Sequence, residues 1–337
     1  MQSYHINTYS EPKGYQLGEL PKPVIENDRD IIIKVHAGSV NPVDVKLASG
    51  VMKMVSPLQF PYKIGYDCAG TVSEVGSAVT RFKVGDEVYV RLKSPDRGSW
   101  SEYAKSTEDL ASLKPTNTSF TEAASIPLAA MTALQALRLA GTLEGKTVFV
   151  PAGFGKNVFK AGKVITTVST AKVPKVNELL GEGVVDRIID YTKSDPKTTI
   201  PPGSVDFIFD TIGMAMPYLS LLRPKTGLVV SISLLPSGDQ LAASGEISVP
   251  YILRQILNFV DAINRWRASW SGVNYQYLWL EPSGKDLEEL KAIIEQGKLR
   301  PVVGTEVHYK DIDAVRAACS VVFNGKGGIG KTVISFE

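Results

Sequence analysis

Hydrophobic and polar positions alternate in short runs along the first third of the chain. The segments DIIIKVHAGSV (30–40), AGTVSEVG (69–76) and DEVYVRL (86–92) have the two-residue period of half-buried strands. Turns that contain glycine separate these runs. The pattern predicts a compact domain that is rich in β-strands.

Near residue 121, the spacing of the apolar residues changes from that of strands to that of a helix. Apolar positions from Ala129 to Leu139 follow helical spacing. Thr121 is placed to cap this helix, Glu122 lies in its first turn, and Gly141 suits its end.

Apolar strand patterns and helical patterns then alternate as far as residue 233. The strand patterns are TVFVP (147–151), KVITTVS (163–169), RIIDY (187–191), VDFIFDTIG (205–213) and LVVSIS (228–233). This order predicts a parallel sheet with helices on its faces. Further helices are predicted at about 249–270, at 285–297 with its end at Gly297, and near 312–323, before a final strand, KTVISF (331–336).

Composition places the chain among ordinary globular proteins. It has 337 residues, of which 44% are hydrophobic and 21% are charged, and its net charge is +2. This charge gives no electrostatic case for binding nucleic acid or an acidic membrane surface. The N-terminus lacks an apolar signal core, no apolar run reaches 18 residues, and two cysteines fit a reducing compartment. We therefore expect a cytoplasmic protein.

Several motifs resemble a known family. They are NPVDVK (41–46), GYDCAGTVSEVG (65–76), VGDEVY (84–89), GSWSEYA (98–104) and IPLAAMTALQAL (126–137). Together they are similar to the medium-chain dehydrogenase/reductase superfamily, in particular to its zinc-free quinone oxidoreductase and enone (enoyl) reductase branch.

The resemblance implies an α/β fold, with a Rossmann-type parallel sheet domain and a GroES-like, β-rich catalytic domain. It implies that residues 1–122, completed by 283–337, form the catalytic domain, and that 123–282 form the cofactor domain. It further implies reduction of a quinone or of the activated C=C bond of an enone or enoyl substrate with NADPH, in a protein that is a homodimer.

The sequence lacks the ligands of the zinc branch of this family. Tyr66 and Asp67 stand where that branch has His and Glu, and there is no cluster of cysteines. The histidines at positions 5, 36 and 308 are scattered. We expect no metal.

The resemblance also assigns residues to the chemistry. Lys46 matches a position that contacts the nicotinamide ribose or the substrate, and a lysine is a suitable donor to an enolate oxygen. Tyr66 would line the pocket, and Asn41 would orient the nicotinamide. Thr132 would face the nicotinamide from its helix. Each has a structural alternative: Lys46 as a surface lysine, Tyr66 as a packed aromatic ring, Asn41 as a turn residue before Pro42, and Thr132 as a buried helical threonine.

Further cofactor contacts are expected at the carboxyl ends of the predicted parallel strands, where ligands bind to open α/β sheets. No acidic residue occurs between Lys163 and Val176, whereas the strand there leads into hydroxyls and lysines. This favours the 2′-phosphate of NADP over the ribose hydroxyls of NAD, with a solvated polar loop as the alternative. The residues expected to contact NADP are Ser169, Thr170, Lys172, Tyr191, Asp210 and Thr211.

The segment GKGGIGKT (325–332) satisfies the P-loop pattern. A P-loop follows a strand and opens a helix, whereas here a helix precedes the segment and VISFE reads as a strand. We therefore expect no ATP site. The resemblance instead brings Asn324 and Lys331 close to the nicotinamide cofactor.

The connection between the first two parallel strands is unusually short. Only AGFGKNVFKAG (152–162) joins Pro151 to Lys163, with Gly153 and Gly155 retained and Val158 at the third glycine position. A helix of six residues spans about 9 Å, whereas a sheet strand is about 17–20 Å long. The helix that presents N–H groups to a pyrophosphate is therefore expected to be missing or a stub.

Three interpretations of this short connection stay open. The chain is a mis-spliced or truncated product, it is a catalytically weak or silent binding protein, or the two glycines still hold the phosphates. The sequence of the remaining site favours an origin as an enzyme.

Overall fold

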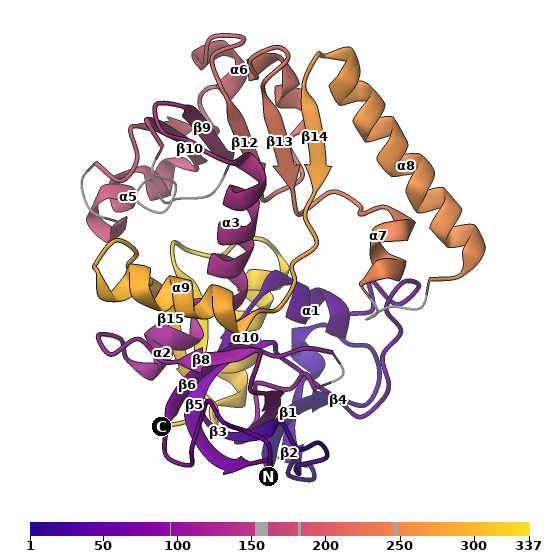
Figure 1. Cartoon of the computed structure of the whole chain (residues 1–337), viewed down its shortest axis with the longest axis vertical. Coiled ribbons are helices and arrows are strands. Elements are labelled where there is room, and N and C mark those ends of the chain that lie inside the picture. Colours follow the sequence, from indigo (N-terminus) through magenta and orange to yellow (C-terminus); the bar gives the residue numbers. More distant parts are fainter. Residues whose placement is uncertain (95, 152–160, 181–182, 245–248) are drawn as a thin grey trace. The chain divides into compact units, whose positions relative to one another are not determined.

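The computed structural model of the chain describes residues 1–94, 96–151, 161–180, 183–244 and 249–337. Two compact units are present, one made of residues 1–131 and 281–337 and the other of residues 132–280 (Figure 1). None of the helices in these described ranges is long and apolar enough to cross a membrane.

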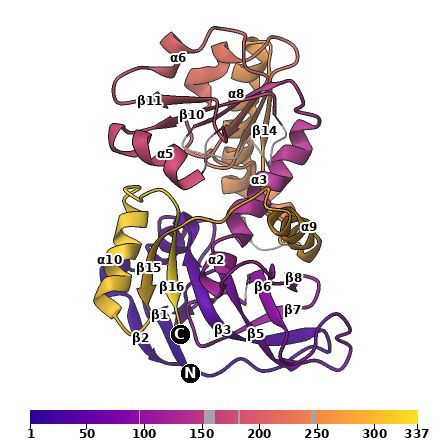
Figure 2. The same ribbon diagram turned by 90° about the vertical axis from the view of Figure 1, so that its left-hand side faces the viewer.

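The first unit is built mainly from antiparallel strands. These strands are β1 (Gln2–Ile6), β2 (Gln16–Glu19), β3 (Asp30–Val40), β4 (Tyr62–Lys63), β5 (Asp67–Val75), β6 (Glu87–Arg91), β7 (Tyr103–Thr107), β8 (Ala111–Leu113), β15 (Val303–His308) and β16 (Lys331–Ser335). One sheet has the order β15-β16-β3-β5-β6-β8, with β7 also paired to β3, and another has the order β2-β1-β4. Because β16 pairs with β3, segments from both ends of the chain share one sheet (Figure 2).

The predicted β-rich character of this unit is confirmed. The helices of the unit are η1 (Pro12–Gly14), α1 (Pro42–Ala48), α2 (Phe120–Ala124), the start of α3 (Pro127–Ala140), α9 (Gly284–Glu295) and α10 (Ile312–Phe323). Alternate residues of β3, Ile31 and Ile33, pack with Val72 of β5 and Val88 of β6 in one core cluster. The strand is found as predicted, but the expected half-buried character is wrong, because β3 is buried along most of its length and Ile32 is as buried as Ile31 and Ile33.

The second unit contains a parallel sheet. Its strands are β9 (Thr147–Pro151), β10 (Lys163–Val168), β11 (Arg187–Asp190), β12 (Phe207–Asp210), β13 (Leu228–Ser231) and β14 (Asn274–Tyr277). They lie in the order β11-β10-β9-β12-β13-β14, and every neighbouring pair is parallel. Numbered by their sequence within this sheet, the strands have the order 3-2-1-4-5-6, which is the order of the Rossmann fold. The chain adds strands on one side of β9 first and then, from β12, on the other side.

Both faces of the parallel sheet are buried. Phe149 and Ile208 belong to one core cluster, whereas Val148 and Phe207 belong to another cluster with Ala136 of α3. The remaining helices of this unit are η2 (Thr170–Lys172), α5 (Val173–Leu180), α6 (Pro196–Thr199), η3 (Met216–Leu221), α7 (Gly238–Ala243) and α8 (Tyr251–Trp270). Continuous apolar runs such as TVFVP are typical of strands that are covered on both sides.

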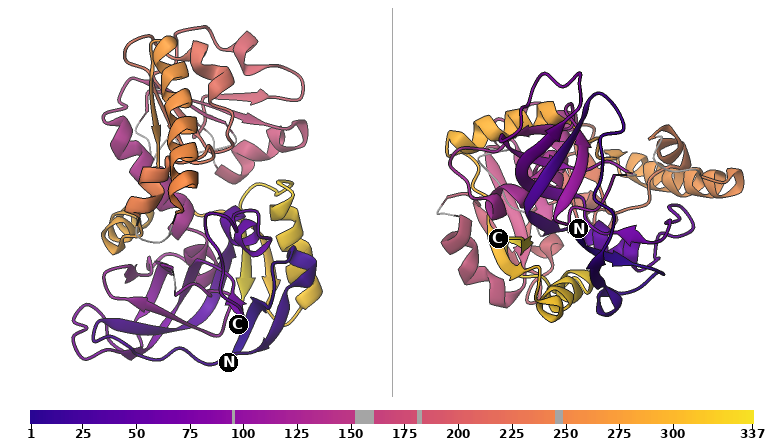
Figure 3. Two further views of the ribbon diagram at one scale, coloured as in Figure 1. Left: turned by 90° about the vertical axis from the view of Figure 1, so that its right-hand side faces the viewer. Right: turned by 90° about the horizontal axis from the view of Figure 1, so that it is seen from below.

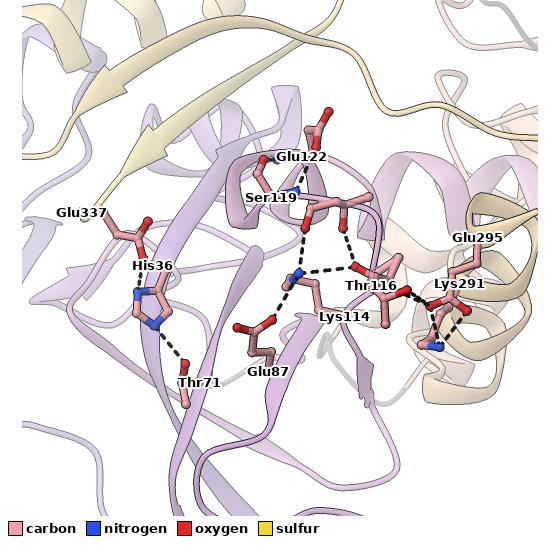
Figure 4. Close-up of polar contacts among 12 residues, drawn as sticks. His36, Thr71, Glu87, Lys114, Thr116, Ser119, Glu122, Lys291, Glu295 and Glu337 are labelled. Atoms are coloured by element: carbon pink, nitrogen blue, oxygen red, sulfur yellow. Dashed lines mark hydrogen bonds and ion pairs between the residues drawn. The ribbon is translucent and has the colours of Figure 1, made fainter. Parts of the chain in front are cut away.

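The prediction of one helix capped by Thr121 is wrong in two respects. Ser119 caps α2, because its Oγ accepts from the Glu122 N–H at 3.1 Å while the Ser119 N–H donates to the Glu122 carboxylate at 2.9 Å (Figure 4). The segment also forms two helices, since Pro127 lacks an N–H group and disfavours helical geometry in the residue before it. The predicted end is confirmed, because Gly141 follows α3 with φ of +66°.

Gly65 lies in a turn that only glycine fits. Its φ is +106°, and an added Cβ would lie 2.5 Å from Cδ1 of the buried Trp100 and against Ser99 Oγ. We expect Gly65→Ala to lower the free energy of unfolding by about 2–4 kcal/mol, because backbone strain adds about 1 kcal/mol to a crowding cost of about 1–3 kcal/mol.

Gly85→Ala is the matched control for this substitution. Gly85 has φ of +96°, yet no atom lies within 4 Å of its added Cβ. This variant should lose only the strain, about 1 kcal/mol, in the same denaturant titration. Equal losses in the two variants would contradict the packing that we describe around Gly65.

Candidate active site

A buried carboxylate, Asp67 at the start of β5, is the centre of a polar network in the first unit. The Asp67 side chain is fully buried. Its Oδ2 accepts hydrogen bonds from Asn41 Nδ2 at 2.9 Å and from Ser39 Oγ at 3.2 Å, and its Oδ1 accepts from the Leu128 N–H at 3.1 Å. Both carboxylate oxygens therefore have donors, which come from β3, from the residue before α1 and from α3.

Lys331 at the start of β16 provides the positive charge of this network. Its Nζ lies 3.9 Å from Asp67 Oδ2 and donates a hydrogen bond to Asn41 Oδ1. The Asn41 amide therefore bridges the lysine and the aspartate. The Lys331 side chain is 15% exposed, whereas Asn41 is fully buried, so the lysine is the member of this trio that solvent or a ligand can reach.

Asp44 is a second buried carboxyl group at the same place. Asn41 is the N-cap of α1, Pro42 begins the helix, and Asp44 at the third helical position accepts the Asn41 N–H at 2.6 Å. Asp44 is fully buried, and its Oδ1 has no hydrogen-bond partner among the described residues. The motif NPVD thus places two carboxyl groups around one asparagine.

Burial decides how these groups are charged. Burial, reinforced by the Asp67 charge, raises the pKa of Asp44 to about 7. Burial also raises the pKa of Asp67 and lowers the pKa of Lys331, and in each case the charge of the other group opposes the shift. We assign Asp67 and Lys331 as the ion pair and place the proton on Asp44, because the shared ammonium lies closer to Asp67.

Tyr66 packs beneath two arginines. The guanidinium carbons of Arg91 and Arg97 lie 4.6 and 5.1 Å from the centre of its ring. Arg97 also donates to the Tyr62 hydroxyl at 3.3 Å and to Ser94 Oγ at 2.6 Å. Tyr66 is only 4% exposed, which matches the packed aromatic ring that the sequence left open as an alternative.

The other residues that the sequence singles out in this unit lie outside the network. Lys46 is exposed in the last turn of α1. Asn324 is exposed at the end of α10, where its Nδ2 donates to the Ser320 carbonyl at 2.7 Å. The segment GKGGIGKT leads into strand β16, so the predicted strand is confirmed and the helix that a P-loop requires does not follow.

The residues expected to contact NADP in the second unit lie where parallel strands end. Ser169 follows β10 and stands at the N-cap position of η2 without a capping hydrogen bond from its side chain, and Tyr191 follows β11 and is 56% exposed. Thr170 is exposed and Lys172 is partly exposed, both in η2. Thr132 is buried within α3. Gly153, Gly155 and the short connection that contains them lie outside the described residues.

Two of these residues, Asp210 and Thr211, form hydrogen bonds that connect the ends of neighbouring strands. Asp210 is fully buried and accepts hydrogen bonds from Ser231 Oγ and the Met214 N–H, both at 2.9 Å. The Thr211 hydroxyl donates to the Pro151 carbonyl at 2.8 Å. These contacts tie the ends of β12, β13 and β9 together.

An acidic residue that the sequence reasoning missed lies beside Thr170. The carboxylate of Asp190, at the end of β11, accepts hydrogen bonds from the Thr170 and Thr192 hydroxyls at 2.6 Å, and these bonds lower its pKa. Asp190 lies beyond the Lys163–Val176 segment in sequence, but β11 is the parallel neighbour of β10 and ends at the same edge of the sheet. Asp44 was missed too, although Asn followed three residues later by Asp resembles a capping box.

A group of three or more His, Cys, Asp or Glu side chains that would hold a metal ion is not found in the part of the chain that the structure describes. Asp67 has its oxygens engaged by Asn41, Ser39 and Leu128, as a structural acceptor does.

Comparison with known proteins agrees with the two-unit fold. The chain matches the family model described as "Alcohol dehydrogenase GroES-like domain" over residues 27–127 and the one described as "Zinc-binding dehydrogenase" over residues 185–334. The solved structure of the quinone oxidoreductase from Coxiella burnetii covers 100% of this chain with 99% of its own, at a TM-score of 0.80 and 27% identity.

Two plant proteins are similar in sequence. The 2-methylene-furan-3-one reductase of Solanum lycopersicum is 33% identical over 329 residues, which cover 93% of this chain and 73% of that protein. The NADPH-dependent alkenal/one oxidoreductase, chloroplastic, of Arabidopsis thaliana is 34% identical over 298 residues, which cover 83% of this chain and 66% of that protein.

A GroES-like unit combined with a parallel sheet of order 3-2-1-4-5-6 defines a two-domain dehydrogenase fold. The chain belongs to the medium-chain dehydrogenase/reductase superfamily.

The raised pKa of Asp44 makes stability depend on pH. The unfolded chain loses this proton near pH 4, whereas the folded protein keeps it up to about pH 7. Between these values the folded state binds more protons, so its stability falls as pH rises, by up to about 1.4 kcal/mol per pH unit. We expect Asp44→Asn to reduce this slope and to raise the free energy of unfolding at pH 8.

Denaturant titrations from pH 5 to pH 8 would measure the effect. Asp28→Asn, at an exposed position, is the matched control and should keep the slope of the unmodified chain. A slope that Asp44→Asn leaves unchanged would show that Asp44 is ionised in the folded protein throughout this range.

Proposed function

We propose that the protein is an NADPH-dependent, zinc-free oxidoreductase that reduces a quinone or the activated C=C bond of an enone or enoyl substrate. One observation carries this proposal: the sequence matches, over 93% of its length, a relative whose name describes the reduction of an exocyclic enone. The alkenal/one oxidoreductase and the quinone oxidoreductase extend the same chemistry to related electron-poor substrates.

The residues of the second unit fit a dinucleotide. Ser169, Tyr191 and Thr211 place hydroxyl groups where β10, β11 and β12 end, at the edge where open α/β sheets bind ligands. NADPH would supply the hydride there. The chain's own task is to hold the cofactor and substrate and to stabilise the oxygen that becomes negative as the hydride adds.

Lys331 is our candidate for that stabilising charge. It is a cation whose side chain is 15% exposed, and the buried Asp67 and the Asn41 amide restrict its position. A donor that is already oriented stabilises a developing oxyanion without further reorganisation. Asn41 is fully buried, so we assign it the role of positioning Lys331 rather than of touching the nicotinamide. We assign the exposed Lys46 to contact with the nicotinamide ribose or the substrate.

Turnover with an enone and with a quinone tests this assignment, measured as the loss of NADPH absorbance. We expect Lys331→Met to lower kcat/KM by about 100-fold or more, the usual effect of removing one oxyanion donor. Lys326→Met, at an exposed lysine of the same C-terminal segment, should leave activity unchanged. Equal activity in both variants would remove Lys331 from the reaction. Absence of turnover in the unmodified chain would instead support the silent, binding member of the family.

The preference for NADPH rests on Lys172 and Ser169. Thr170 donates its hydroxyl to Asp190, so we assign the 2′-phosphate mainly to the other two residues. A charge-assisted hydrogen bond from a lysine to phosphate contributes about 1.5–3 kcal/mol, or about 10- to 150-fold in affinity. We expect Lys172→Ala to weaken NADPH binding by this factor and to leave NADH binding nearly unchanged.

Fluorescence titration of both cofactors measures this preference. Asp190→Asn gives a test of opposite sign, because removing a negative charge near the phosphate should strengthen NADPH binding. Equal affinity of the unmodified chain for NADPH and NADH, or a preference for NADH that Asp190→Asn abolishes, would assign Asp190 to the ribose hydroxyls of NAD instead.

We also propose that the protein is zinc-independent, and the engaged carboxylate of Asp67 supports this proposal. Metal analysis after dialysis against EDTA should find less than about one-tenth of a zinc ion per chain, with full activity retained. About one zinc per chain, lost together with activity, would contradict the proposal. The buried free thiols of Cys68 and Cys319 support placing the protein in a reducing compartment such as the cytoplasm.

A further inference from the structure

A groove of about 650 Å³ lies in the second unit, at the edge of the parallel sheet where the strands begin. Its lining includes Phe207, Leu228 and Asn274, which are the first residues of β12, β13 and β14. Lys146 and Asp206, which also line it, directly precede β9 and β12. Ligands of open α/β sheets bind at the opposite edge, where the strands end. The groove is therefore separate from the residues that we assign to NADPH.

Three of the side chains that line this groove are cationic, whereas one is acidic. The cations are Lys146, Arg223 and Arg265, and the acid is Asp206. The side chains of Arg223 and Arg265 are 55% and 50% exposed. Lys146 is partly exposed, and within the described ranges its side chain takes part in no hydrogen bond or ion pair. The lysine charge is therefore left for solvent or for a ligand.

Each arginine is held by a carboxylate at one edge of its guanidinium group. Arg223 Nε donates to Asp206 Oδ1 at 2.9 Å, and Arg265 Nε donates to Asp261 Oδ2 at 2.6 Å. These two carboxylates are only 16% and 7% exposed, and Asp206 Oδ2 also accepts the Thr147 N–H at 2.9 Å. The terminal nitrogens of both arginines have no hydrogen-bond partner among the residues that the structure describes. Both guanidinium groups are thus oriented and keep N–H groups for a ligand.

Tyr275 of β14 lines the same groove and is 5% exposed. Its hydroxyl and Asp261 Oδ1 are buried, and neither atom has a hydrogen-bond partner in the described part of the chain. Figure 3 shows α8, which carries Asp261 and Arg265, alongside β14. Burial, reinforced by the Asp261 charge, raises the pKa of Tyr275, so the hydroxyl keeps its proton at neutral pH. Because buried polar atoms in native proteins are nearly always bonded, this wall of the groove has bonding capacity that the chain does not use.

The groove also has a surface for an organic group. Ala140, Leu143 and Leu228 contribute apolar side chains to its lining, and the exposed Asn274 and Gln276 present amides from β14. Its volume lies within the range of about 300–1,000 Å³ that is typical of small-molecule sites. Apolar groups and amides beside a set of cations fit a small molecule that carries an anionic group.

The number of donors favours phosphate as that anionic group. A carboxylate has two oxygens, which one guanidinium fork can engage, whereas a phosphate group has more oxygens and about two negative charges near neutral pH. We propose that this groove binds the phosphate group of a small molecule, held by Lys146, Arg223 and Arg265. This inference does not depend on the proposed reductase activity, because the groove lies at the other edge of the sheet.

Lysine acetylation, measured for each peptide by mass spectrometry, tests the site. The full-length chain would be treated with acetic anhydride in inorganic pyrophosphate, with sodium chloride of equal ionic strength as the reference. If Kd is about 1 mM or lower, about 10 mM pyrophosphate fills about nine-tenths of the sites and should slow the acetylation of Lys146 about tenfold. Lys163, exposed at the start of β10 on the same edge of the sheet, is the matched control and should react at an unchanged rate.

The variant Arg265→Lys gives a second test, because it keeps a positive charge for Asp261 and loses the terminal guanidinium nitrogens. It should need about tenfold more pyrophosphate for the same protection of Lys146. Acetylation of Lys146 that pyrophosphate leaves unchanged would overturn the inference, as would equal protection in Arg265→Lys. Protection confined to Lys172 would assign pyrophosphate to the edge where the strands end and would also overturn it.

Discussion

The structure of the first unit depends on one buried carboxylate, Asp67. An ionised carboxyl group is costly to remove from water unless it is paired and fully hydrogen-bonded. Asp67 meets this requirement with Lys331 of β16, Asn41 before α1, Ser39 of β3 and the Leu128 N–H of α3. Removing one partner of such a pair typically costs about 3–5 kcal/mol, because a charge stays buried without its counterion. The network thus holds segments from both ends of the chain to one another.

The same constraint sets the charges of the groups around Asp67. Burial raises the pKa of Asp44 to about 7 and also raises the pKa of Asp67, whereas the Lys331 charge opposes the shift at Asp67. Lys331 is therefore held by a buried carboxylate and an amide, and its side chain is 15% exposed. Under the proposed function, Lys331 would oppose the negative charge that arises when a hydride adds to an enone or quinone.

The sequence predicts the strands and long helices well, because burial imposes a period on apolar residues. The strand predicted at 163–169 is found at Lys163–Val168, and the helix predicted near 312–323 is found at Ile312–Phe323. The pattern could not show the break at Pro127 within a continuous apolar period, or the pairing of Asp190 with Thr170 across neighbouring strands. Lys331 and Asn41 are 290 residues apart, so only the resemblance placed both near the cofactor, and their contact required the sheet pairing of β16 with β3.

Isotope transfer tests the central claim most directly. The protein would be incubated with NADPH that carries deuterium on the transferred face of nicotinamide C4, together with a simple enone, and the product analysed by NMR and mass spectrometry. The account predicts one deuterium on the β-carbon and a solvent proton on the α-carbon of the saturated ketone. Recovery of unreduced enone, or of an allylic alcohol with deuterium on the carbonyl carbon, would contradict it.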